Sequence, residues 1–147
     1  MEKRIVPNGL LLGEVSRLVA EGEKVTIMTK GSSMLPFIVG ERDSVVLQRP
    51  ENLVPGIIVL AFVEDSRYVL HRIISLEGDK VTLMGDGNLA GVERCRTEDI
   101  KAVAVRIISP EGETDCMSRK HFRRAAIWKT LLPVRRWLLA IYRRLFI

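Results

Sequence analysis

Three short polar segments of this sequence carry side chains that could support nucleophilic chemistry. The first is "GSSMLP" at residues 31–36, the second is His71 within "YVLHRII", and the third is "MGDGN" at residues 84–88. A serine hydroxyl becomes a good nucleophile only when a neighbouring base removes its proton. Histidine suits that task near neutral pH, and a carboxylate can orient the histidine. The three segments together contain two serines, one histidine and one aspartate.

Each segment also has an ordinary structural interpretation. The serine segment could be a turn that ends at Pro36. A lone histidine inside an apolar strand is more often a satisfied core or edge residue than a catalyst, and strand alternation would place His71 on the same face as Val69 and Ile73. An Asp-Gly pair between two strands is a common hairpin turn. Taken one at a time, the segments leave structure and chemistry open.

The elements expected to position these residues are one helix and a series of short strands. Apolar residues at helical spacing, with Gly22 as a stop, predict a helix from Pro7 to Gly22. Six β-rich runs follow, separated by segments of good turn composition. They are residues 24–28, 44–48, 56–63, 67–76, 80–84 and 100–108. This order predicts a mainly β fold, with a coiled antiparallel sheet or partial barrel.

Charge divides the chain into two parts. Residues 118–147 contain nine Lys or Arg and no acid, whereas the rest contains 14 bases and 18 acids. The net charge of +5 therefore belongs to the end of the chain, and the mildly acidic remainder argues against a nucleic-acid partner. We accordingly divide the chain into a body, residues 1–117, and a basic helical tail, residues 118–147.

The tail is also amphipathic. Pro133 separates its last segment, "VRRWLLAIYRRLFI", from the basic residues before it. A helix over this segment would spread its arginines, Arg135 among them, over one side. Its apolar residues would share the other side, namely Val134, Trp137, Leu138, Ile141 and Leu145. Such a helix could dock on the body or lie on an anionic membrane surface, and both alternatives stay open.

The sequence has no signal for export, for membrane spanning or for a cofactor. No run approaches the roughly 18–20 apolar residues of a transmembrane helix, and Glu14 comes too early for a signal-peptide core. We expect a cytoplasmic protein that the tail could hold peripherally on the inner face of the membrane. Cys95 and Cys116 lack metal-ligand spacing and are expected to be buried free thiols. We expect neither a metal nor a cofactor.

The order and context of these segments resemble a known family. "GSSMLP", "ERDSVVL", "VPGIIVLAF", "VLHRII" and "MGDGN" follow one another between Val25 and Ile108. In this order they resemble the signal peptidase I and LexA superfamily of serine peptidases. The His71-Arg72 pair is similar to the histidine-base branch, which includes the archaeal and endoplasmic-reticulum signal peptidases. The resemblance implies the coiled β fold of that superfamily.

The resemblance also implies a role for each polar residue. Ser33, directly before Met34, would be the nucleophile, and His71 would be the general base and later the general acid. Asp86 would be the acid that orients the histidine. The oxyanion hole would consist of backbone donors, with the Ser33 N–H first and with Ser32 and Gly31 beside it.

Glu93 is a second candidate for the orienting acid. It lies a few residues beyond the acidic segment, where the histidine branch usually carries a further aspartate. Of the two carboxylates, Asp86 is the preferred one.

These assignments predict a serine endopeptidase that cuts a peptide or preprotein, and the resemblance implies cleavage at a small-residue site. One alternative is a non-catalytic peptide-binding module on the same fold. Another is a LexA-like autoproteolytic regulator. The regulator is the least supported, because the segment before the first predicted strand is too short for a helix-turn-helix domain.

Overall fold

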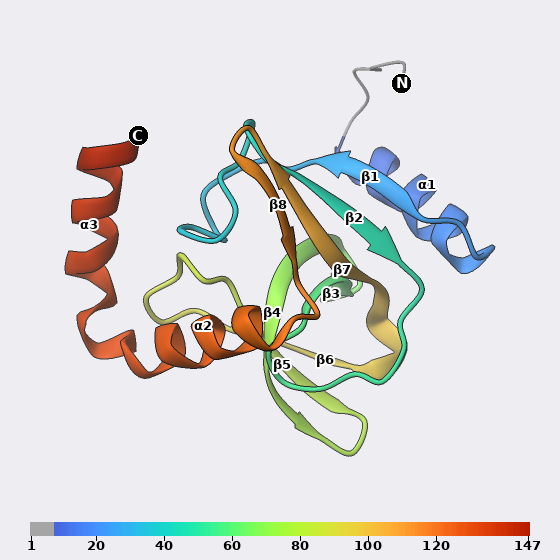
Figure 1. Cartoon of the computed structure of the whole chain (residues 1–147). Helices are drawn as coiled ribbons and strands as arrows, with labels where there is room; N and C mark the ends of the chain where they lie inside the picture. The colour runs from blue at the N-terminus through green and yellow to red at the C-terminus, as the bar shows by residue number, and fades with distance from the viewer. Residues whose placement is uncertain (1–7) are drawn as a thin grey trace.

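The computed structural model describes residues 8–147, and side chains from Leu11 onward. A helix precedes a curled antiparallel sheet, and two further helices follow it (Figure 1). The prediction of a mainly β fold with a helix at each end is confirmed. The predicted helix start at Pro7 lies outside the described residues.

The described part of the chain contains three α-helices and eight strands. The helices are α1 (Asn8–Ala20), α2 (Arg119–Thr130) and α3 (Arg135–Phe146). The strands are β1 (Val25–Met28), β2 (Ser44–Gln48), β3 (Ile58–Val63), β4 (Arg67–Glu77), β5 (Lys80–Met84), β6 (Glu93–Arg96), β7 (Ile100–Ser109) and β8 (Gly112–Asp115). All six predicted strands are present. The sequence analysis missed β6 and β8, because both are rich in charged and polar residues and lack a periodic apolar pattern.

All the strands pair antiparallel in the order β1-β2-β7-β3-β4-β5-β6, and β8 pairs with β7. Register shifts at Val46/Leu47 and Leu60/Ala61 help the sheet to curl. Several strand edges stay free of strand partners in the described part, and two of them concern the loop after β1. One is the outer edge of β1. The other is the first half of β4, because β5 begins to pair with β4 only at Arg72.

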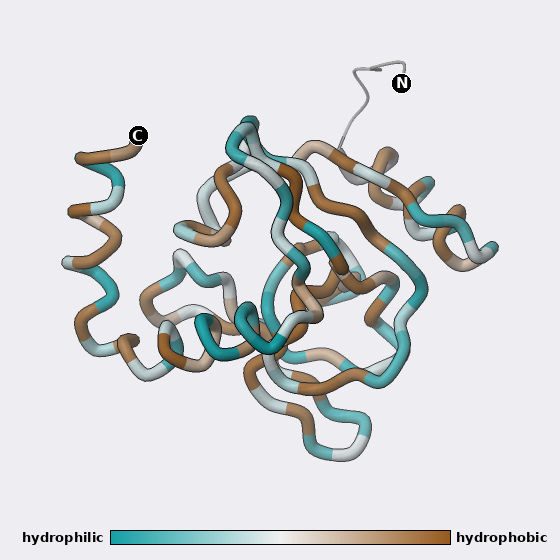
Figure 2. Tube along the Cα trace, in the orientation of Figure 1, coloured by the Kyte–Doolittle hydropathy of each residue, from teal (hydrophilic) through white to brown (hydrophobic). Residues whose placement is uncertain are grey.

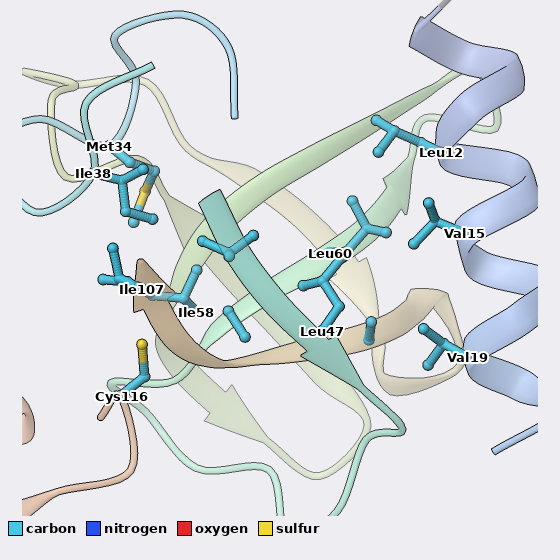
Figure 3. Close-up of a cluster of buried hydrophobic side chains, with 13 residues drawn as sticks. Leu12, Val15, Val19, Met34, Ile38, Leu47, Ile58, Leu60, Ile107 and Cys116 are labelled. Atoms are coloured by element: carbon cyan, nitrogen blue, oxygen red, sulfur yellow. The ribbon is translucent and has the colours of Figure 1, made fainter. Parts of the chain in front are cut away.

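The curl separates two buried clusters, one on each face of the sheet. Along β3, Ile58 and Leu60 enter the first cluster, whereas Val59 and Ala61 enter the second. In the first cluster, α1 covers one end and the segment that follows β1 covers the other (Figure 3). Full burial of each large aliphatic side chain stabilises the fold by about 1.5–3 kcal/mol. Burial of Met34 and Ile38 at one end of this cluster therefore helps to fix the loop after β1.

The basic tail contacts the body through one part of its surface. Buried residues on α2 and α3 include His121, Arg135 and Leu139. The prediction that Arg135 lies on a solvated basic face is therefore wrong, since its side chain reaches into the body. Trp137 and Ile141 stay 60% and 55% exposed, in agreement with an apolar stripe on the outer side. Figure 2 shows the alternation of apolar and polar segments along α3. No helix among residues 8–147 is long and apolar enough to cross a membrane.

Candidate active site

The loop between β1 and β2 carries Ser33 and is closed at its base. The Thr29 N–H and hydroxyl both donate to the Asp43 carbonyl, at 3.0 and 2.8 Å. The Val39 N–H donates to Asp43 Oδ2 at 2.8 Å, and Asp43 is only 1% exposed. Asp43 therefore ties the two ends of the loop together, and the serine has a rigid support.

Within this loop, Ser33 begins a tight turn whose apolar residues are anchored in the core. Met34 and Ile38 are buried in the first cluster, and the Ile38 N–H donates to the Met34 carbonyl at 3.0 Å. Ser33 is half-buried, whereas Ser32 is exposed. The two adjacent serines therefore differ in environment.

A cleft of about 440 Å³ brings the predicted residues together. Ser33, His71 and Glu93 line it, and so does Gly31. Its walls include the end of β1 and the first half of β4, and both of these strands have an edge without a strand partner. Ser32 and Asp86 do not line this cleft. The structure thus groups four of the candidate residues and leaves two outside.

His71 forms a short contact with Glu93. Its Nδ1 lies 2.5 Å from Glu93 Oε1, and the two side chains are 8% and 11% exposed. Arg67 Nη2 lies 3.6 Å from Glu93 Oε2. Because a carboxylate only accepts hydrogen bonds, Nδ1 carries the proton, and Nε2 remains free to accept one. Among residues 8–147, no hydrogen bond joins His71 to Ser33.

The expectation that Asp86 orients His71 is wrong in its geometry. Ile73 pairs with Leu83, and Leu83 pairs with Glu93, so these three residues share one face of the sheet. His71 is two residues from Ile73 and lies on that same face. Glu93 therefore reaches His71 across the sheet.

Asp86 is instead the partner of Arg72, on the opposite face. Arg72 Nε and Nη2 donate to its two carboxylate oxygens at 2.9 and 2.7 Å. Arg72 Nη1 donates to the Gly56 carbonyl at 2.7 Å and lies 3.0 Å from His121 Nε2. Both members of the pair are at least 95% buried. A buried, bidentate pair of this kind is a strong interaction that organises the fold around it.

His121 is a neutral acceptor in this arrangement. Burial, together with the Arg72 charge, lowers the pKa of His121 to about 4. At neutral pH its Nε2 can therefore accept the Arg72 N–H. The contact joins α2 to the buried pair.

The loop at residues 85–88 packs directly on the serine turn. The Gly87 N–H donates to the Ser33 carbonyl at 2.8 Å, and the Asp86 N–H points to Met34 Sδ at 3.4 Å. A Cβ on Gly85 would come within 2.3 Å of the Ser33 carbonyl oxygen, and one on Gly87 within 2.4 Å of the Ser32 carbonyl oxygen. The two glycines are required here because backbone lies against backbone.

The sequence analysis preferred Asp86 to Glu93 as the partner of His71. It also did not predict that Asp43 closes the serine loop, or that Trp128 and Arg135 bind the loop at residues 85–88. Glu93 lies in β6, which the apolar pattern did not reveal. The registers of β6 with β5 and of β5 with β4 place its side chain on the His71 face, and the sequence does not show these registers. The tail contacts have no comparable signal in a single sequence.

The two cysteines do not take part in this site. Cys116 is buried and Cys95 is half-buried, and both are free thiols. Burial raises the pKa of Cys116 to about 12 and that of Cys95 to about 11, which makes both poor nucleophiles. In the described residues no group of three or more His, Cys, Asp or Glu side chains could hold a metal ion.

Comparison with known proteins leaves the geometry as the main guide to function. No protein-family model matches the chain, and no curated protein matches it.

Proposed function

We propose that this protein is a serine endopeptidase with Ser33 as nucleophile and a His71–Glu93 pair as its base. The observation that carries the proposal is the 2.5 Å His71–Glu93 contact in the cleft that Ser33 also lines. A histidine that a carboxylate fixes, in the same cleft as a serine, supplies the groups that activate a hydroxyl.

The reaction follows from these groups. Ser33 Oγ attacks the peptide carbonyl carbon while His71 Nε2 takes the hydroxyl proton, and Glu93 stabilises the resulting imidazolium. The imidazolium then protonates the leaving amine as the C–N bond breaks. Water, deprotonated by the same nitrogen, hydrolyses the acyl-enzyme and returns Ser33 to its starting state. The Ser33 N–H is the first candidate donor to the oxyanion.

The substrate would bind in an extended conformation. The cleft lies between the free edges of β1 and the first half of β4, and a peptide strand can add its main-chain hydrogen bonds to such edges. Its walls include apolar side chains such as Leu12, Ile27 and Leu70. These features favour an unfolded segment or a linker as the cleaved chain, and they also fit the alternative of a peptide-binding module.

We further propose that the chain belongs to the signal peptidase I and LexA superfamily, in its histidine-base branch. The ordered segments and the curled β fold support this assignment. In this proposal Glu93, rather than Asp86, takes the role of the orienting acid.

A covalent serine probe tests the proposed chemistry. A fluorophosphonate should label the wild-type chain at Ser33, and Ser33→Ala should abolish both labelling and peptide cleavage. Ser32→Ala is the matched control and should keep both, because Ser32 is exposed and outside the cleft. Peptide binding by an unlabelled and inactive wild-type chain would favour the binding module. Labelling that moves to Ser32 would overturn the choice of nucleophile.

For localisation, we propose that a cytoplasmic chain associates peripherally with the inner face of the membrane through α3. Trp137, Ile141 and Leu145 form an exposed apolar stripe, and Arg143 and Arg144 next to it are also exposed. Apolar burial and attraction to anionic lipid together can hold such a helix at a bilayer surface.

Point variants test this association better than truncation, because residues of the tail also contact the body. Trp137→Glu with Ile141→Glu should abolish co-sedimentation with phosphatidylglycerol vesicles. Ile127→Glu is the control, since Ile127 is an exposed apolar residue of α2 outside the stripe. Added salt should weaken wild-type binding by screening. Equal sedimentation of all three chains would refute a membrane role for the stripe.

A further inference from the structure

Two side chains of the tail bind the backbone of the loop at residues 85–88, which also contacts the Ser33 turn. Trp128 Nε1 donates to the Asp86 carbonyl at 2.7 Å. Arg135 Nη1 donates to the Asn88 carbonyl at 2.9 Å. Both bonds end on backbone oxygens of the short segment whose Gly87 N–H binds the Ser33 carbonyl. In Figure 1 the tail runs past this loop on its way to the C-terminus.

The same two residues also fix each other. The Arg135 guanidinium lies 5.1 Å from the centre of a Trp128 ring, and its Nη2 donates to the Trp128 carbonyl at 3.2 Å. Arg135 is only 4% exposed, and burial lowers its pKa. Within the described part of the chain it forms no ion pair with an acid, so it depends on these carbonyls and on the ring. The two carbonyl acceptors and the ring therefore determine where this buried guanidinium lies.

Apart from the tail contacts, the loop is held by the Asp86 side chain, by its contacts with the serine turn and by one bond within the loop. Gly85 and Gly87 have no side chains, and within the loop the Asn88 N–H donates to the Gly85 carbonyl at 3.0 Å. The Asp86 side chain is fixed by Arg72, but the carbonyls of Asp86 and Asn88 are held by the tail. Loss of the tail contacts would release the surface on which the serine turn rests.

We propose that Trp128 and Arg135 are positioning residues that set the place of Ser33 relative to His71 through the loop at residues 85–88. This inference rests on the proposed peptidase function and deepens it, because it makes the tail part of the catalytic unit. Displacement of a reacting group by about 1 Å can slow a reaction by up to 100-fold. The tail therefore controls reactivity without touching the substrate.

The test compares substitutions that remove one tail contact at a time. Trp128→Phe removes the Nε1–H and keeps an aromatic ring, and Arg135→Gln removes the buried charge. Tyr142→Phe and Arg123→Gln are matched controls, because they make the same kind of change at tail positions with no hydrogen bond to the loop among residues 8–147. All chains are labelled with the fluorophosphonate well below their unfolding temperatures.

The expected result is a second-order labelling rate at Ser33 about tenfold lower for Trp128→Phe and Arg135→Gln than for either control. With a peptide substrate, kcat should fall and KM should change little, because the cleft walls are intact. A merely structural role would lower the unfolding temperature and leave the labelling rate of the folded chain unchanged. That outcome would overturn the proposal.

Amide hydrogen exchange separates failure of this inference from failure of the proposed function. Trp128→Phe and Arg135→Gln should each speed exchange of the Gly87 amide, which is bonded to the Ser33 carbonyl. Tyr142→Phe and Arg123→Gln should leave it unchanged. If wild-type Ser33 is not labelled, faster exchange in the first two variants still shows that Trp128 and Arg135 hold the loop at residues 85–88. Unchanged exchange in them refutes the inference.

Discussion

The two faces of β4 carry two polar pairs that are adjacent in sequence and opposite in environment. On one face His71 contacts Glu93 at the wall of an open cleft. On the other face Arg72 binds Asp86 in a pair enclosed by α2 and by the Phe37 ring, which lies 4.7 Å from the guanidinium. The His-Arg dipeptide thus divides into one residue available for chemistry and one that organises the scaffold.

This difference shows how a strand can separate two functions by a single position. Successive side chains of a strand point to opposite faces, so the neighbour of a residue in the cleft is free to pack in the core. The partner of each carboxylate depends on the face of β4 on which the carboxylate lies. Glu93 and Asp86 are seven residues apart in the chain and serve opposite faces of the same strand.

The largest expected effect is on activity, from Glu93→Gln. We expect the Ser33 labelling rate to fall by roughly 10²–10⁴-fold, because the amide can stabilise the wrong tautomer and cannot stabilise the imidazolium. Glu98→Gln, on an exposed carboxylate nearby, should have no effect. If Glu93→Gln kept the wild-type rate while folded Asp86→Asn lost it, the orienting role would return to Asp86.

Asp86→Asn should mainly lower stability. It leaves the Arg72 guanidinium buried without its counter-charge, so the free energy of unfolding should fall by about 3 kcal/mol. Asp79→Asn is the control, because Asp79 pairs with Arg96 at 3.1 Å on the exposed surface, and its loss should cost less than about 1 kcal/mol. Urea unfolding measures both. Equal losses for the two variants would contradict the distinction between scaffold and surface pairs.

Gly87→Ala tests the contact between the loop at residues 85–88 and the turn that carries Ser33. The added Cβ would meet the Ser32 carbonyl oxygen at 2.4 Å, so backbone must shift. We expect a loss of about 1–3 kcal/mol in unfolding free energy, together with slower labelling of Ser33. Gly91→Ala is the control, since no atom lies within 4 Å of its Cβ position. A Gly87→Ala chain as stable and as reactive as the control would show that the loop does not brace the serine.

The smallest expected effect is a dependence of stability on pH at His121. Its pKa is about 4 in the folded chain and about 6.5 when unfolded, so between these values the unfolded chain binds more protons. The contribution of His121 is therefore complete above pH ~6.5 and is lost as pH falls to ~4, by on the order of 1–2 kcal/mol. Arg72 and Arg124 favour the neutral ring, and Asp115 opposes them.

The comparison of wild type with His121→Gln isolates this dependence. Urea unfolding from pH 7 to pH 4 should give a shallower loss of stability in the variant, which keeps an acceptor for Arg72 but does not titrate. Identical slopes in the two chains would show that His121 does not contribute.

Sequence alone was sufficient for much of the fold. The six apolar strands and α1 follow from local periodicity, because each buries a face of its own against the core. Local patterns also identified Ser33 and His71, which line one cleft. Their side-chain types and their placement beside strands were enough to mark them as candidates.

Tertiary structure alone decided which carboxylate meets the histidine and what the tail contacts. The choice between Asp86 and Glu93 depends on the pairing of β6, a charged strand that forms because β5 offers it an edge. The helical pattern of the tail predicts that Arg135 is a surface charge, yet it is buried against Asn88 and Trp128. Contacts between distant segments carry no local periodicity. The sequence could therefore name the residue types of the site, whereas their partners emerged only from the folded chain.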